Sequence, residues 1–211
     1  MTDGRERILI VPDPSDRRAL TAFLTRAVRL DDAAVVRLHR RDDGHVSVWA
    51  ATGFDALATR TVTGEIEPAD LVAGADAVLA GLAVGTGTID PGFPLDSAWR
   101  GALPPATGYE HVDDVPAEVV RDLARDGARL AEQQGRPPAS LLDQNVLTVV
   151  SDTTTVGVDM RSVFALEAMG FVPTEGDVVR VRASRTWLRL DARYGSVYRR
   201  RTGTLELSVS G

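Results

Sequence analysis

The chain has 211 residues, of which 44% are hydrophobic and 26% are charged, and its formal net charge is −6. This composition is typical of a globular protein with a substantial core, and the negative charge disfavours a general nucleic-acid coat. The chain has no cysteine and no lysine, which excludes disulfides, cysteine-ligated zinc, Schiff-base lysines and P-loops. The first apolar run, Ile8–Val11, is too short to span a membrane, so we expect a cytoplasmic protein with no membrane partner.

Residues 1–66 are predicted to form a β-α-β-β-β unit. A short apolar strand ends at Pro12, and Ser15 or Asp16 is expected to cap the helix that follows. Apolar residues recur along this helix at the spacing i, i+3, i+4 and i+7, namely at Leu20, Phe23, Leu24 and Ala27. Three alternating strands are predicted next, at 33–41, 45–51 and 57–66, and Asp42-Asp43-Gly44 is the expected turn between the first two.

Residues 67–145 are predicted to form a helical connecting segment. Pro68 stands where a helix would begin, and an apolar stripe continues to Leu82. Glycines and prolines after this stripe predict a loop. A short helix is expected at 95–103, and the clearest helix of the chain at 114–135. We expect these helices to cover the units on either side.

The first unit is predicted to recur over residues 146–211. Val146–Val150 is expected to be a strand, and Met160–Met169 a helix that ends at Gly170, a residue favoured for a left-handed cap. Strands are predicted at four places after this helix, namely 178–183, 187–192, 196–201 and 205–209. The last two take the place of the single strand 57–66, or form one long strand with a bulge at 202–203.

An internal repeat relates the two units. Shifted by 143 positions, residues 18–40 lie on residues 161–183 without a gap, with five identities and with apolar positions matched by apolar ones. We therefore predict an α+β protein of tandem duplicated β-α-β-β-β units with antiparallel-rich sheets. The two units are expected to pack as one globular body about a pseudo-two-fold axis, because each apolar face must be buried.

This order of elements resembles that of the DNA sliding clamps, whose domains contain a β-α-β-β-β unit twice. The matching features are the strands Ile8–Val11 and Val146–Val150, the helix after each strand, and a meander that carries Asp42-Asp43-Gly44 and Gly53. The resemblance covers about 125 residues and lies in element order, not in a diagnostic motif, so no functional residue is carried over.

The resemblance implies association with DNA as one alternative, because the helices of clamps line a ring and face DNA. The first helix carries four arginines that suit this role, Arg17, Arg18, Arg26 and Arg29. The second helix offers only Arg161. Fold alone does not establish function.

No catalytic or metal-binding constellation stands out in the sequence. His39 and His45 flank the Asp42-Asp43-Gly44 turn and can in principle share a metal, but a solvated turn explains them as well. The glycines of 81–87 resemble a phosphate loop, but they follow a helix and lack a lysine. The hydroxyl-rich run 152–155 is expected to be turn and strand. We predict no catalytic residue, no cofactor and no bound metal.

Arginines gather in the C-terminal strands. Residues 161–211 hold nine arginines and five acidic residues, whereas residues 1–160 hold 15 and 25. Strand alternation places Arg180, Arg182 and Arg189 on the face opposite the apolar residues, and each is expected to be exposed or paired with a carboxylate. The possible interaction surface comprises Arg180, Arg182, Arg185, Arg189, Arg193, Arg199 and Arg201. This face is merely solvated, or it contacts an acidic protein surface or another copy of the chain, or, less favoured, it binds nucleic acid.

Three classes of function remain open. The first choice is a non-enzymatic interaction or scaffold protein, because no catalytic constellation is found. The first alternative is a DNA-associated clamp-like protein, for which salt-dependent binding of DNA is the test. The second alternative is a small-ligand-binding protein or enzyme with a site between the repeats, which a pocket with convergent polar groups would favour.

Overall fold

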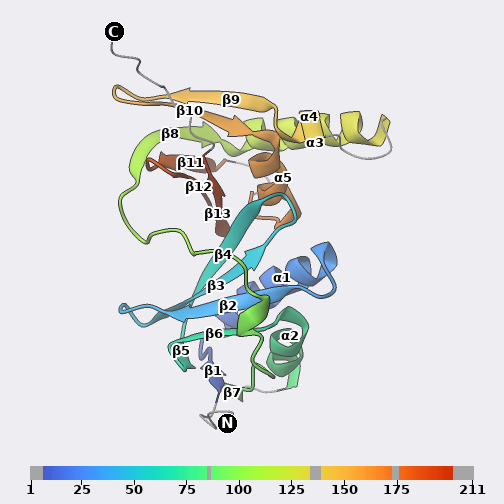
Figure 1. Ribbon diagram of the computed structural model, residues 1–211, viewed down its shortest axis with the longest axis vertical. Coiled ribbons are helices and arrows are strands. Elements are labelled where there is room, and N and C mark those ends of the chain that lie inside the picture. The colour runs from blue at the N-terminus through green and yellow to red at the C-terminus, as the bar shows by residue number, and fades with distance from the viewer. Residues whose placement is uncertain (1–6, 85–86, 134–138, 173–175, 202–211) are drawn as a thin grey trace.

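The computed structural model describes residues 7–84, 87–133, 139–172 and 176–201 (Figure 1). The N-terminal half contains, in order, β1 (Ile8–Ile10), α1 (Pro14–Leu30), β2 (Val35–Arg40), β3 (His45–Ala51), β4 (Ala56–Thr63), β5 (Glu65–Glu67), β6 (Asp70–Gly74), α2 (Ala75–Val84), β7 (Thr88–Ile89) and the 3-10 helix η1 (Asp96–Ala98). The C-terminal half contains β8 (Glu110–Pro116), α3 (Ala117–Gln133), α4 (Ala139–Leu142), β9 (Asn145–Val150), β10 (Thr155–Asp159), α5 (Met160–Ala168), β11 (Val178–Ala183), β12 (Trp187–Ala192) and β13 (Gly195–Arg200). In the described part of the chain, each helix is too short or too polar to cross a membrane.

One antiparallel sheet of eight strands runs through both halves, in the order β6-β2-β3-β4-β13-β12-β11-β8. The two meanders join edge to edge, because β4 pairs with β13 from Thr59–Ser196 to Ala56–Arg199. From either end of the sheet, the order is one edge strand followed by a three-stranded meander. A pseudo-two-fold axis between β4 and β13 requires this order, so the predicted α+β class and duplication are confirmed.

Helix α1 begins one residue after Asp13, whose carboxylate accepts hydrogen bonds from the backbone N–H groups of Ser15 and Asp16 at 2.7 and 3.0 Å. The sequence predicts Ser15 or Asp16 as the cap. The observed start is earlier because Pro14 has no N–H that needs a partner and suits the first helical position. The predicted apolar stripe is buried as expected, at Leu20, Phe23, Leu24 and Ala27.

The long helices form two pairs, α1 with α2 and α3 with α5, on one side of the eight-stranded sheet (Figure 1). Helix α1 packs on β4, and α5 packs on β4 and β13, so the repeated helices occupy corresponding places on the two meanders. Helix α5 ends before Gly170, whose φ of 58° is the left-handed conformation predicted for it. The main core lies between these helices and the sheet, and it continues across the β4–β13 junction.

The opposite face of the sheet carries a smaller aromatic cluster of Trp49, Trp187 and Tyr198. The segment between η1 and β8 crosses this face (Figure 1). It packs Trp99 and Tyr109 against the cluster. Trp49 of β3 belongs to this cluster and not to the main core, as strand alternation requires. The crossing segment nevertheless leaves Trp49 only 8% exposed, which alternation alone does not reveal.

Residues 67–145 contain two of the three predicted helices, as α2 and α3, and also strands that the sequence does not predict. The helix expected at 95–103 is reduced to the three residues of η1, and the helix expected from residue 114 begins only at Ala117, because residues 110–116 pair with β11 as β8. Strand β6 forms one edge of the large sheet, beside β2, and β8 forms the other edge, beside β11. Leu71 and Val72 therefore lie in a strand, and the helix predicted from Pro68 begins only at Ala75. A short apolar run suits a strand or a helix equally, and here the hydrogen bonding to β2 favours the strand.

The strands that precede the repeated helices differ between the halves. Strand β1 lies between β5 and β7 in a separate three-stranded sheet, whereas β9 and β10 form a two-stranded hairpin. The predicted strand 57–66 is divided at Gly64, where a Cβ would lie 2.3 Å from the backbone oxygen of Ile10 in β1. The predicted strand 205–209 lies outside the described residues.

Candidate functional site

Two aromatic pairs join the halves beside the β4–β13 ladder. Phe23 of α1 stacks on Phe171, which follows α5, with ring centroids 6.2 Å apart and planes 5° apart. Phe54, in the β3–β4 turn, packs against Phe164 of α5 at 5.9 Å. Aromatic pairs at these separations attract each other beyond the effect of burial. Each pair therefore holds one half of the chain to the other.

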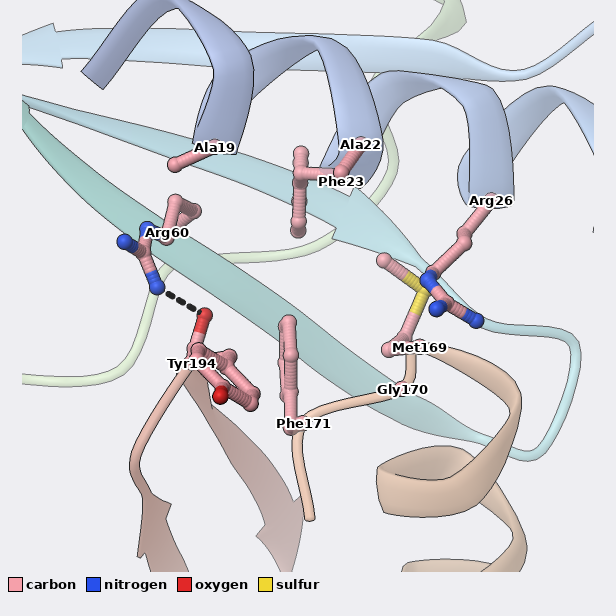
Figure 2. Close-up of a pocket in the computed structure, with 9 residues that line it drawn as sticks. All are labelled: Ala19, Ala22, Phe23, Arg26, Arg60, Met169, Gly170, Phe171 and Tyr194. Atoms are coloured by element: carbon pink, nitrogen blue, oxygen red, sulfur yellow. Dashed lines mark hydrogen bonds between the residues drawn. The ribbon is translucent and has the colours of Figure 1, made fainter. Parts of the chain in front are cut away.

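A cavity of about 210 Å³ opens at this junction. Its lining comes from both halves, with Ala19, Ala22, Phe23 and Arg26 from α1, Arg60 from β4, Met169, Gly170 and Phe171 from the end of α5, and Tyr194 from the β12–β13 turn. Figure 2 shows the stacked rings of Phe23 and Phe171 between the two arginines. The cavity thus lies between the repeats.

Arg26 reaches the cavity because the chain opposite it has no side chain. Its guanidinium lies against Gly170, where a Cβ would be 2.2 Å from Arg26 Cζ. Gly170 follows the C-terminus of α5, and the partial negative charge of a helix C-terminus favours a nearby cation. Within the described part of the chain, the side chain of Arg26 forms no hydrogen bond or ion pair. Its N–H groups remain available to an acceptor.

Arg60 lies at the other end of the cavity, close to Tyr194 (Figure 2). Its Nη1 donates a hydrogen bond to the backbone oxygen of Tyr194, which ties β4 to the β12–β13 turn. Its Nε is buried and has no hydrogen-bond partner among the described residues. Because this nitrogen is shielded from solvent, it is not accessible to a ligand in the cavity.

The cavity combines two guanidinium groups with an apolar floor. Phe23, Met169 and Phe171 are each at most 3% exposed, and no acidic side chain is among the described lining residues. Guanidinium groups bind carboxylates and phosphates, often through two parallel hydrogen bonds. The same lining residues include no histidine, serine or carboxylate, the usual nucleophiles and general bases. The arrangement therefore suits binding of an anion with an apolar body.

The three arginines expected on the polar face of the C-terminal strands are all paired. Arg180 bonds Asp114 of β8 at 3.0 Å, and Arg189 bonds Asp191 at 2.7 Å. Arg182 lies 3.5 Å from the same Asp191. The expectation that each is exposed or paired with a carboxylate is confirmed. The Arg180 guanidinium, with a smaller contribution from His111, lowers the pKa of the Asp114 carboxyl.

Arg189 also contacts the aromatic cluster on this face. Its guanidinium carbon lies 5.3 Å from the ring centroid of Tyr198 and 5.7 Å from that of Tyr109. Burial raises the pKa of both phenols to about 12. Cations over aromatic faces are attracted by the ring quadrupole, so Arg189 helps to fix the crossing segment on the sheet.

The other four arginines of the possible interaction surface lie elsewhere. Arg185 is exposed in the β11–β12 turn, and Arg193, in the β12–β13 turn, pairs with Asp177 at 3.2 Å. Arg199 pairs with Asp159, the N-cap of α5, and Arg201 donates to the backbone oxygen of Ser184 at 2.8 Å. The structure therefore brings Arg180, Arg182 and Arg189 together and separates them from the rest. An interaction at these residues stays a prediction.

The histidines flanking the β2–β3 turn have different carboxylate partners. His39 lies 3.4 Å from Asp70, whose pKa the Arg37 guanidinium lowers, and His45 lies 3.1 Å from Asp43. Among the described residues, no three histidine or acidic side chains are grouped as metal ligands. In the run 81–87, Gly81 belongs to α2, and residues 85 and 86 lie outside the described residues.

Sequence reasoning does not identify the cavity residues. From the sequence alone, Arg26 is one of four arginines on the first helix, and Arg60 is only a residue of a predicted strand. One usable signal is the face formed by Ala19, Ala22 and Arg26 at helical spacing, because two small residues beside an apolar stripe leave room next to a charge. The opposing wall comes from residues more than 130 positions away, which no local pattern indicates.

Comparison with known domain families divides the chain into two parts. Residues 4–101 match "Domain of unknown function (DUF8010)", and residues 104–204 match "Domain of unknown function (DUF8185)". The boundary falls in the segment that crosses the aromatic face. No protein with a curated description is similar to the chain in sequence.

Several solved structures share the fold. The DNA polymerase sliding clamp from Bacillus subtilis superposes with a TM-score of 0.61 at 14% identity, over 94% of this chain and 65% of the clamp. The beta subunit of the DNA polymerase of Streptococcus pyogenes gives 0.58 at 13% identity, over 92% and 64%. DNA polymerase III beta subunit from Thermotoga maritima gives 0.57 at 13% identity, over the same shares. The chain thus has the sliding-clamp fold and spans slightly less than two thirds of the length of these clamps.

Proposed function

We propose that this chain is a non-enzymatic interaction protein that uses the clamp fold as a scaffold and binds its ligand in the cavity between the two halves. The cavity itself carries this proposal, because the two halves together place a guanidinium group at each end of an apolar floor (Figure 2). Ligand sites are commonly concave, mostly apolar and furnished with a few convergent polar groups. The chemistry of the described lining supports binding without a chemical step.

Filling the cavity tests this proposal. Ala22→Trp introduces a large ring from an exposed position of α1 that lines the cavity, and Ala128→Trp is a matched change at an exposed position of α3 outside the lining. We expect small fragments to shift the amide NMR signals of cavity residues in the wild type and in Ala128→Trp, but not in Ala22→Trp. A fragment set that leaves all cavity signals unchanged, or that the protein converts chemically, would refute the proposal.

Association with DNA is the second candidate function, favoured by the similarity to sliding clamps and by the arginines of α1. Two of those arginines have other contacts, since Arg17 donates to the backbone oxygen of Leu82 at 2.9 Å and Arg26 lines the cavity. On α3, Arg125 and Arg129 pair with aspartates three residues earlier. The two ion pairs neutralise positive charge on the helix side, and the contacts of Arg17 and Arg26 occupy side chains that DNA would need.

Fluorescence anisotropy with duplex DNA distinguishes this candidate. DNA association predicts binding that weakens steeply as salt rises, because each neutralised phosphate releases a counterion. It also predicts weaker binding by an Arg18→Gln, Arg29→Gln double variant. We expect no binding beyond the general background at physiological salt.

A further inference from the structure

We infer that the cavity ligand is a small carboxylic acid with one flat apolar body, and that Arg26 binds its carboxylate. This inference rests on the proposed function and adds the chemical class of the ligand. Its basis is the contrast between the arginines of the cavity and other arginines at the same junction.

Other arginines at the junction have carboxylate partners. Arg161, 14% exposed, lies 3.0 Å from Asp55 and 2.7 Å from Asp143. Arg199, 15% exposed, pairs with Asp159. Both of these partly buried arginines therefore have the carboxylate partner that the cost of desolvating a charge favours.

The cavity arginines lack such partners among the described residues. Arg26 is partly buried and unpaired, and the contact of Arg60 is with a backbone oxygen, which carries no full charge. Two guanidinium groups beside one apolar cavity create a positive potential that an anion relieves. A carboxylate matches the planar fork of a guanidinium and forms stronger hydrogen bonds with it than a neutral acceptor does.

The remaining lining limits the rest of the ligand. The rings of Phe23 and Phe171 form a flat apolar floor, and Ala19 and Ala22 are too small to fill the space above it (Figure 2). A volume of about 210 Å³ is roughly seven times the share of one water in the liquid. It is also below the usual 300–1,000 Å³ or so of sites for drug-sized ligands. One aromatic ring with a short acidic arm fits this space.

Phenylacetate and its neutral analogue phenylacetamide test the inference, because they differ mainly in charge. Each is titrated into isotope-labelled full-length protein while the amide signals of Ala22 and Gly170 are followed by NMR. We expect phenylacetate to bind at least about tenfold more tightly than the amide, since hydrogen bonds to charged groups are roughly twice as strong as neutral ones.

Arg26→Gln and Arg29→Gln form a matched pair of variants, because both arginines are in α1 and only Arg26 lines the cavity. Arg26→Gln should remove the preference for the acid by weakening its binding far more than that of the amide, whereas Arg29→Gln should change neither. Well-dispersed spectra show that each variant is folded.

Each other outcome has a distinct meaning. Equal binding of acid and amide at the cavity overturns the carboxylate assignment and leaves the proposed function standing. A preference for the acid that survives Arg26→Gln overturns the role of Arg26. Absence of cavity shifts with both compounds, up to their solubility limits, overturns the inference, and the fragment screen then decides the proposed function separately.

Discussion

The Phe23–Phe171 stack is predicted to couple the stability of the two halves. Both rings are almost fully buried, and the stack joins α1 to the segment after α5. Replacing either residue by leucine removes three buried carbons, which costs about 2 kcal/mol at roughly 0.8 kcal/mol per buried methylene. Each single replacement also loses the stacking attraction, about 0.5–1.5 kcal/mol. The double variant loses that attraction only once, so its destabilisation should be smaller than the sum by about 0.5–1.5 kcal/mol.

Urea unfolding, followed by tryptophan fluorescence, measures this double-mutant cycle. A control cycle combines Phe23→Leu with Tyr109→Leu, because Phe23 lies in the main core and Tyr109 on the opposite face of the sheet. Control effects should add to within about 0.3–0.5 kcal/mol, as for independent sites. If the Phe23–Phe171 cycle is additive to the same degree, the stack does not couple the halves and the reasoning is wrong.

Three further predictions concern the polar face and the close approach of β1. Tyr109 and Tyr198 should ionise only near pH 12, as measured by tyrosinate absorbance, and ionisation of all tyrosines near pH 10 would contradict their burial. Because the pKa values of both phenols are raised in the folded state, the free energy of unfolding should be intact below about pH 10 and fall as the pH rises towards 12. Arg189→Ser should lower the free energy of unfolding by about 1–3 kcal/mol, because it removes two ring contacts and an ion pair, and Arg180→Ser should lower it less. Equal losses of the two variants in urea titrations would argue against the ring contacts. Gly64→Ala should destabilise by about 1–3 kcal/mol, since its Cβ would meet a backbone oxygen of β1, and an unchanged thermal midpoint would show that the strand can move aside.

Features that depend on neighbouring residues in the chain could be predicted from the sequence. The stripe that buries Leu20 and Leu24, the turn at Asp42-Asp43-Gly44 and the cap at Gly170 each follow from a few adjacent side chains. The repeat added the correspondence of α1 with α5. Together these observations predicted the pseudo-two-fold arrangement of the meanders.

Features that depend on distant partners could not be predicted in this way. Strand β8 has only two buried apolar residues, Val112 and Val115, and becomes a strand through pairing with β11. The cavity forms where Arg26 and Gly170 meet, although 144 positions separate them in the chain. Local periodicity contains no information about such contacts.

The β4–β13 pairing has a consequence for attempts to study the two matched domains apart. Either domain made alone would expose β4 or β13 as a free edge, which is a template for aggregation. The same edges, together with the aromatic contacts of the crossing segment, should allow fragments 1–102 and 103–211 to reassemble when they are produced together. The chain is thus suited to fragment complementation, in which recovery of the soluble pair reports directly on the strength of the central strand pairing.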